Sequence, residues 1–368
     1  MKSRNGFVPK EKDHSIENVL VLQGGGSLGA YECGVYKTLD KHGIKFDIIA
    51  GTSIGGINAA IITGAMGDKP AKTLEDFWLN LAETVTPSFL SEQARAFTSS
   101  MYASMWGNPN AFLPVWLMPN SFNFFNMWPY LYDITPLKKT LQEFVDFKNL
   151  KDPSRPRLIV TSTDIQNGKP SIFDSMYDNI NADHVIASAG YPFYGISWTI
   201  INDKYLWDGT LLSNTPLTEV IHASPKRSKK VYLVDLFPHH QEEIPKNMIE
   251  AWHRARDIMQ IDKTNKTVRL SKTITQYLEL LQQMYDILVE LFDSGKLDET
   301  SREKFKKVEP EYYKLADERG ALIKDITRIE RHERMHFLFE DADFSLCTIK
   351  QLISNGEKDA EKVLSAKS

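Results

Sequence analysis

Two glycine-rich turns near the start of the chain contain the residue types that acyl transfer needs. The first is Gly24-Gly25-Gly26-Ser27-Leu28-Gly29, and the second is Gly51-Thr52-Ser53-Ile54-Gly55. The backbone N–H groups of the first turn could stabilise an oxyanion. The second has the form of a nucleophile elbow, in which a serine lies on a sharp turn between a strand and a helix. Together the turns predict an enzyme with Ser53 as its nucleophile.

The elements next to these turns predict a parallel α/β fold. Residues 18–23 and 46–50 are short apolar runs typical of buried strands, and each enters one of the two turns. Residues 30–42 have a helical pattern, and residues 57–65 are small and apolar, as in a helix packed closely on a sheet. Strands and helices that alternate in this way indicate a mainly parallel central sheet flanked by helices.

The alternation of strands and helices predicts a first domain over 14–244. A helix-rich C-terminal region is expected over 245–368. In the first domain we expect helices over 73–81 and 137–147, strands over 157–163, 205–207 and 231–236, and a hairpin strand over 169–174. In the C-terminal region we expect a long amphipathic helix over 274–292, a strand within 321–339 and a closing helix over 345–364. This region is expected to pack on the α/β core.

Composition and charge exclude several classes of protein. The 368 residues are 42% hydrophobic and carry a net charge of −4, which does not favour a nucleic-acid partner or strong attraction to anionic lipid. The first 18 residues show no secretory signal, and no stretch reaches the roughly 20 apolar residues that span a bilayer. Cys33 and Cys347 are too few for a disulfide scaffold. We expect a soluble cytoplasmic protein that can contact a membrane peripherally; its oligomeric state stays open.

The first glycine turn also matches the dinucleotide-binding fingerprint, as Gly24-x-Gly26-x-x-Gly29. That site needs an acidic residue at the far end of the second strand to hold the ribose. Asp47 lies at the near end of this strand, and the far end enters the serine turn. We therefore favour the oxyanion interpretation and keep NAD(P) binding as an alternative.

Histidine patterns suggest two metal sites that we do not favour. His332-Glu333-Arg334-Met335-His336 matches the zinc-protease pattern H-E-x-x-H, but its surroundings suit a strand edge or a solvated segment, and no third histidine follows. His239 and His240 are adjacent, and adjacent residues of an extended chain point to opposite sides. We expect no metal site.

A third motif connects the two glycine turns to a known family. Asp208-Gly209-Thr210 follows Trp207 at the end of a predicted strand, where the simplest interpretation is a hairpin turn. With the glycine loop, the Gly-x-Ser-x-Gly turn and this Asp-Gly turn in this order, the chain resembles the patatin-like phospholipase family over approximately residues 18–234. Residues 187–192 and 213–216 are similar to the stretches before and after the late Asp-Gly turn of that family.

The resemblance implies a patatin-like three-layer α/β fold and a serine lipid acyl hydrolase without a metal or cofactor, acting on a lipid or acyl ester. Leu28 stands where many members carry Lys or Arg, and Thr210 stands where they carry Gly or Ala. The roles carried over are nucleophile for Ser53, base for Asp208, oxyanion loop for Gly24, Gly25, Gly26 and Gly29, and elbow for Gly51 and Gly55. The alternative is a non-catalytic lipid-binding or storage protein on the same scaffold.

A Ser-Asp dyad places a physical requirement on Asp208. An exposed aspartate titrates near pH 4 and is too acidic to accept a serine proton efficiently at neutral pH. We therefore predict that Asp208 is buried, which raises its pKa, and that it lies within hydrogen-bond reach of Ser53.

Residues 97–132 hold eleven aromatic residues and four methionines without a clear period. Two interpretations stay open for this stretch: a lid or acyl-binding wall, and an insertion that fills the core. Tyrosine and tryptophan suit a membrane interface. The near absence of Lys and Arg favours a neutral ester or lipid over electrostatic docking.

Overall fold

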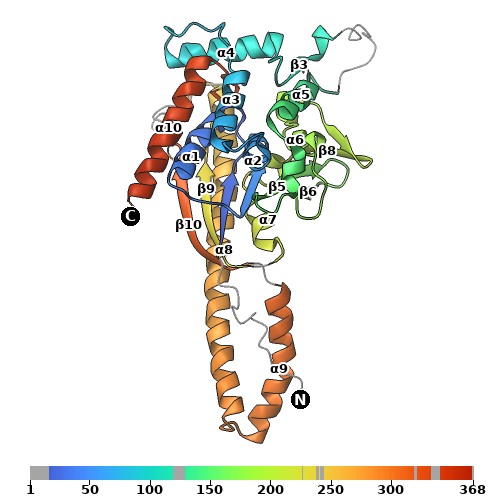
Figure 1. Ribbon diagram of the computed structural model, residues 1–368, viewed down its shortest axis with the longest axis vertical. Coiled ribbons are helices and arrows are strands. Elements are labelled where there is room, and N and C mark those ends of the chain that lie inside the picture. The colour runs from blue at the N-terminus through green and yellow to red at the C-terminus, as the bar shows by residue number, and fades with distance from the viewer. Residues whose placement is uncertain are drawn as a thin grey trace.

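The computed structural model describes residues 16–118, 129–225, 227–237, 240, 244–318, 321–332 and 340–366. The strands are β1 (Glu17–Leu22), β2 (Ile48–Thr52), β3 (Leu113–Pro114), β4 (Tyr132–Asp133), β5 (Arg157–Asp164), β6 (Lys169–Asp174), β7 (Thr199–Ile201), β8 (Lys204–Asp208), β9 (Lys229–Asp235) and β10 (Ile323–Glu330). The helices are α1 (Gly29–Lys41), α2 (Ile54–Gly64), α3 (Pro70–Leu81), α4 (Glu92–Trp106), α5 (Thr135–Phe144), α6 (Ala182–Ile186), α7 (Leu217–His222), α8 (Met248–Asp293), α9 (Glu299–Glu318) and α10 (Leu346–Ser365) (Figure 1).

A mainly parallel sheet forms the centre of the body, in the order β10-β9-β1-β2-β5-β8-β7. The strands from β10 to β5 pair in parallel, whereas β6 and β8 pair with β5, and β7 with β8, in the antiparallel direction. On β1, Leu20 and Leu22 belong to one buried apolar cluster, and Val19 and Val21 to another. Both faces of the sheet are therefore covered, which explains the unbroken apolar run in this strand.

Helices cover the two faces as separate layers. Helices α1, α2, α3 and α10 contribute to the cluster on one face, and α7 with the inner part of α8 contributes to the other. The predicted three-layer α/β fold, with a mainly parallel sheet and a helix-rich C-terminus, is confirmed.

The C-terminal region completes the sheet as well as adding helices. The strand predicted within 321–339 is present as β10, which pairs in parallel with β9 at the edge of the sheet. Helix α10 crosses α1 at very short range, because Gly34 and Gly356 face each other's helices: a Cβ at Gly34 would lie 1.9 Å from the Ile353 carbonyl oxygen. The β5–β6 hairpin predicted over 157–174 is also confirmed.

Two helices differ from the sequence-based expectation. Part of the aromatic stretch, for which no period was found, belongs to α4; Ala96 and Ala103 are buried there while Phe97 and Met101 are exposed. Because apolar side chains lie on both the buried and the exposed sides, the helical period is hidden. The helix expected over 274–292 is only the outer part of α8, which begins at Met248.

Helices α8 and α9 form a hairpin that projects from the body (Figure 1). The rings of Tyr285 on α8 and Tyr312 on α9 stack with their centroids 4.0 Å apart, which joins the two helices side by side. Within the described ranges, no helix is long and apolar enough to cross a membrane.

Candidate active site

Ser53 lies in a sharp turn between β2 and α2. Its backbone has φ 56° and ψ −127°, which is uncommon for a residue other than glycine and is the strained geometry of a nucleophile elbow. Gly51 and Gly55 permit this turn, because a Cβ at Gly51 would lie 2.1 Å from the Gly55 carbonyl oxygen, and one at Gly55 would lie 2.6 Å from the Gln23 carbonyl oxygen. The side chain of Ser53 is partly exposed and lines a cavity.

Ser188 holds the backbone of this turn in place. The Ser53 amide donates to Ser188 Oγ at 2.8 Å, and the Ser188 hydroxyl donates in turn to the Thr161 carbonyl oxygen at 2.5 Å. Ser188 is fully buried. The Ser188 hydroxyl group therefore links strand β5 to the backbone of the elbow.

Asp208 is the last residue of β8 and reaches the same point from the antiparallel side of the sheet. It is 1% exposed, so the predicted burial is confirmed. Burial raises the pKa of Asp208 to about 6, although the neighbouring Ser53 hydroxyl and the hydrogen bond from Thr210 counteract part of this rise. The Thr210 amide donates to Asp208 Oδ1 at 2.8 Å. Oδ2 accepts no hydrogen bond of good geometry from any described residue, Ser53 included, so it is open to the Ser53 hydroxyl group.

The glycine loop lies directly against Ser53. A Cβ at Gly24 would lie 2.8 Å from Ser53 Cβ, so only glycine fits there. Gly24, Gly25 and Gly26 line the cavity, and the amides of Gly25 and Gly26 donate to no described residue. These two N–H groups are therefore available to an oxyanion. Gly29 is not in the cavity lining: it begins α1 and packs against Ile54 and Trp78.

Asn214 joins the glycine loop to the Asp208 turn. Its Oδ1 accepts from the Gly24 amide at 2.9 Å and from Thr210 Oγ1 at 3.1 Å, and its Nδ2 donates to the Gly24 carbonyl oxygen at 3.2 Å. The threonine that departs from the family's Gly or Ala thus adds a hydrogen bond between the two turns. Asn214 lies in the segment 213–216, but its sequence position alone does not reveal this link.

Glu32 supports the other side of the glycine loop from α1. Its carboxylate accepts from the Gln23 amide at 2.7 Å and from Asn58 Nδ2 at 2.8 Å, and the Asn58 side chain also contacts Gly29 and Trp78. Burial raises the pKa of Glu32 to about 8. The loop is therefore held by hydrogen bonds on both sides.

An apolar cavity of about 260 Å³ opens beside Ser53. Parts of the aromatic stretch contribute to its wall, and the apolar lining includes Leu81, Ala103, Ala111, Phe112, Tyr132, Ile134, Leu137, Ile196 and Phe344. The stretch therefore lines the cavity along part of its length, while residues 119–128 lie outside the described residues.

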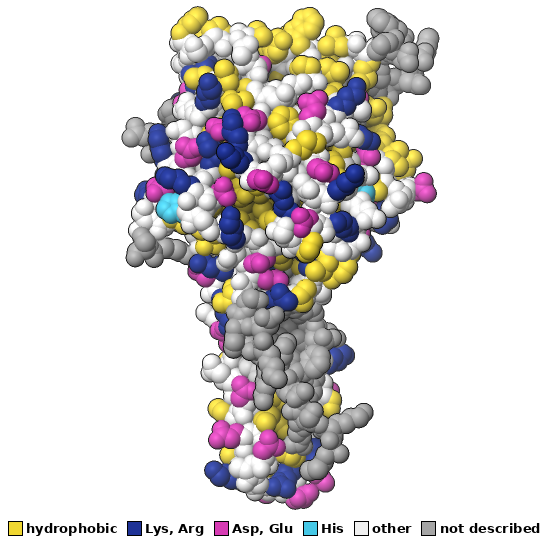
Figure 2. Space-filling view, in the orientation of Figure 1, with side chains coloured by type: hydrophobic (Ala, Val, Ile, Leu, Met, Phe, Trp, Pro, Cys, Tyr) yellow, Lys and Arg dark blue, Asp and Glu magenta, His cyan; other side chains and the backbone are white. Residues whose placement is uncertain are grey.

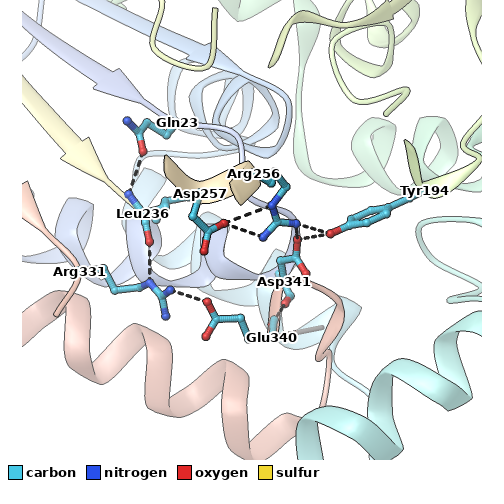
Figure 3. A network of polar contacts seen from close by, with 9 residues as sticks. Gln23, Tyr194, Leu236, Arg256, Asp257, Arg331, Glu340 and Asp341 are labelled. Atoms are coloured by element: carbon cyan, nitrogen blue, oxygen red, sulfur yellow. Dashed lines mark hydrogen bonds and ion pairs between the residues drawn. The ribbon is translucent and has the colours of Figure 1, made fainter. Parts of the chain in front are cut away.

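The cavity also has a polar end, built from segments that are distant in the sequence. Arg256 and Gln260 of α8 line it together with Tyr194 and Asp341. Figure 3 shows the Arg256 side chain between Asp257, Asp341 and Tyr194. Sequence reasoning missed these residues, because nothing in the local sequence places α8 against the glycine loop.

Asp47 and His240, two of the residues considered for the alternative interpretations, do not line the cavity. Asp47 precedes β2 and accepts from the Asn18 amide at 2.7 Å, at the end of the sheet opposite the glycine loop. Of the two histidine patterns, residues 333–336 and His239 lie outside the described residues, and His240 is exposed. Within the part of the chain that the structure describes, no cluster of His, Cys, Asp and Glu could hold a metal ion.

Comparison with known proteins assigns the family. A family model described as patatin-like phospholipase matches residues 20–221, which is more than half of the chain. The chain therefore belongs to the patatin-like phospholipase family.

Curated relatives include phospholipases. A cGAMP-activated phospholipase of Vibrio cholerae is 26% identical over 231 residues, covering 56% of this chain and 58% of the relative. Patatin-like protein 4 of Arabidopsis thaliana is 26% identical over 238 residues, covering 58% of this chain and 53% of the relative. The chain thus spans a little over half the length of these relatives. Among solved structures, VipD from Legionella pneumophila is 12% identical to this chain, and the match covers 96% of this chain and 67% of VipD. Its TM-score is 0.41, which is too low to support an argument about fold.

Proposed function

We propose that this chain is a serine lipid acyl hydrolase that cleaves carboxylic esters of lipids through a Ser53–Asp208 dyad. The observation that carries the proposal is the partly exposed Ser53, strained in its elbow, beside a buried Asp208 in the lining of an apolar cavity. Membership in the patatin-like phospholipase family supports a lipid ester as the substrate.

The geometry supports a two-step reaction. Asp208 accepts the proton of the Ser53 hydroxyl while the serine oxygen attacks the ester carbonyl carbon. The amides of Gly25 and Gly26 stabilise the negative charge on the carbonyl oxygen, aided by the N-terminus of α2. The ester bond then breaks, the alcohol leaves with the proton from Asp208, and the acyl group stays on Ser53. In the second step Asp208 takes a proton from water, and the hydroxide attacks the acyl carbon. The bond to Ser53 then breaks, the serine oxygen takes the proton back from Asp208, and the carboxylic acid is released.

The outer face of α4 is our candidate for contact with a lipid aggregate. Ala103 and Ser104 of this helix line the cavity, whereas Phe97, Met101 and Trp106 are exposed. Figure 2 shows hydrophobic side chains along the edge of the body where Figure 1 places α4. We expect the protein to co-sediment with vesicles of a neutral phospholipid, and a variant with Phe97→Ser and Trp106→Ser to bind them at least several-fold more weakly; equal binding would refute this contact.

Covalent labelling tests the proposed chemistry without a choice of substrate. A fluorophosphonate reacts with an activated serine, so the labelled peptide should contain Ser53, and Asp208→Asn should slow labelling strongly. Ser104→Ala is the matched control, because Ser104 lines the same cavity. A lipid-binding or storage protein need not activate this serine, so a native protein that does not react would favour that alternative.

A further inference from the structure

The polar end of the cavity has groups that the acyl-transfer steps do not use. Arg256 and Gln260 lie one turn apart on α8, and both line the cavity. Asp341, from the short 3₁₀ helix Glu340–Ala342, lines it as well. All three side chains are nearly removed from water, so each needs a polar partner in the folded protein.

The arginine already has its partners. Its Nε and Nη2 donate to Asp257 Oδ1 at 3.2 and 2.9 Å, and its Nη1 donates to Asp341 Oδ2 at 2.6 Å and to the Tyr194 hydroxyl at 2.5 Å (Figure 3). The group of Arg256, Asp257 and Asp341 has one positive and two negative charges. This end of the cavity therefore does not attract a phosphate.

Two hydrogen-bond acceptors at this end lack partners. Gln260 Oε1 and Asp341 Oδ1 are both buried and accept no hydrogen bond from any residue that the structure describes. Each residue is only 6% exposed. A buried acceptor without a donor destabilises the free protein, and the same acceptor gains a full hydrogen bond when a ligand supplies the donor. Two such acceptors in the lining of one cavity indicate a subsite for a hydrogen-bond donor.

This subsite adjoins the glycine loop. A Cβ at Gly26 would lie 2.2 Å from the Asp341 carbonyl oxygen, and Ser27 Oγ donates to the Glu340 carbonyl oxygen at 2.9 Å. An ester whose carbonyl oxygen faces Gly25 and Gly26 can therefore place its alcohol portion towards Asp341 and its acyl chain on the apolar lining.

On the basis of the function proposed above, we propose that Gln260 and Asp341 bind a free hydroxyl group on the alcohol portion of the substrate. A hydroxyl is a donor that fits, because it is neutral and can donate to either acceptor, whereas the two carboxylates repel a phosphate. The enzyme then prefers acyl esters of a neutral polyol, such as a monoacylglycerol, over esters of a simple alkyl alcohol.

The test compares two soluble esters with the same acyl chain, the monooctanoyl ester of glycerol and propyl octanoate. For the full chain, kcat/KM should be at least about tenfold higher for the glycerol ester, because the alkyl ester leaves the buried acceptors unpaired. Gln260→Met should reduce this ratio several-fold. Gln283→Met is the matched control, an exposed glutamine of the same helix.

The outcomes separate this proposal from the proposed function. Hydrolysis of both esters with equal kcat/KM, or an unchanged ratio in Gln260→Met, would refute the hydroxyl subsite and leave the hydrolase intact. If neither ester is hydrolysed, the result would count against the proposed hydrolase function. In that case calorimetric binding of octylglycerol ether, compared with octyl propyl ether, still tests the subsite: the native chain should prefer the glycerol ether and Gln260→Met should not. Equal binding of both ethers to the native chain would overturn the proposal.

Discussion

At the scale of single residues, the site depends on a carboxylate that is held away from water. Burial raises the pKa of Asp208 to about 6, whereas an exposed aspartate titrates near 4. A pKa of this size makes Asp208 a better proton acceptor while it stays ionised at neutral pH. In the proposed dyad, burial therefore gives Asp208 the proton-accepting role that a histidine has in the Ser-His-Asp triad.

The first prediction is a pH profile. We expect kcat/KM for a soluble ester to rise with pH through an apparent pKa of about 6, because only the ionised Asp208 accepts the serine proton. Initial rates between about pH 4 and 8 would measure this profile. A midpoint near pH 4, the value of an exposed aspartate, would contradict the role given to its burial.

The second prediction concerns stability. The folded pKa of Asp208 is above the unfolded one, so its contribution to the free energy of unfolding is fully present below about pH 4 and is lost as the pH rises through about 6. Asparagine cannot ionise. Asp208→Asn should therefore raise the free energy of unfolding by up to about 3 kcal/mol at pH 7, and by almost nothing below pH 4.

Urea denaturation of both proteins at the two pH values would measure this difference. The exposed Asp68 provides the control, since Asp68→Asn should change stability little at either pH. A variant of Asp208 that is less stable than the native protein at pH 7 would show that the ionised carboxylate stabilises the fold.

At the scale of elements, the site is assembled from turns that follow different strands. Ser53 follows β2, the glycine loop follows β1, and Asp208 ends β8. Single side chains fix these turns relative to one another: Ser188 holds the elbow, and Asn214 links the glycine loop to the Asp208 turn. In the proposed reaction these two residues are positioning residues, because they hold the turns in place through hydrogen bonds.

The third prediction tests the Asn214 link. Asn214→Ala removes the hydrogen bonds to Gly24 and Thr210, so we expect kcat to fall about tenfold or more while KM changes little. Asn108→Ala is the matched control, because Asn108 is also buried and bonds backbone groups, of Leu81 and Asn110. Both variants should lose about 1–3 kcal/mol of stability. An equal fall in kcat in both variants would show that Asn214 acts only through stability.

The limits of sequence reasoning also lie at this scale. The motifs around Ser53 and Asp208 are local patterns with a recognisable chemistry, and the apolar runs of β1 and β2 show a sheet buried on both faces. The contacts of Asn214 and Gln260 join segments far apart along the chain, and a single sequence contains no sign of such contacts. The sequence of helix α4 shows no helical period for a different reason: its apolar residues lie on its exposed side as well as on its buried side.

At the scale of the whole molecule, one helix joins the cavity to the projecting hairpin. The inner part of α8 supplies Arg256 and Gln260 to the cavity and Val268 to the core. Its outer part pairs with α9 away from the body (Figure 1). The two parts of α8 therefore serve different purposes, and the tip of the hairpin contributes nothing to the cavity lining.

The fourth prediction removes that tip. A variant in which a short Gly/Ser linker replaces residues 283–311 keeps Gln282 and Tyr312, which contact each other across the hairpin. We expect kcat/KM for a soluble ester to stay within about twofold of the native value, because every residue that lines the cavity is retained. Circular dichroism would check that the body still folds. A folded variant with a large loss of activity would show that the tip acts on the site.

The dyad itself is tested most directly by hydrolysis of p-nitrophenyl esters of graded acyl length, with the native protein, Ser53→Ala and the control Ser104→Ala. We predict turnover in the native protein and in the control, and its loss in Ser53→Ala by about a thousandfold or more. The apolar cavity predicts that activity depends on acyl length. Turnover that persists in Ser53→Ala would contradict Ser53 as the nucleophile, and with it the central claim.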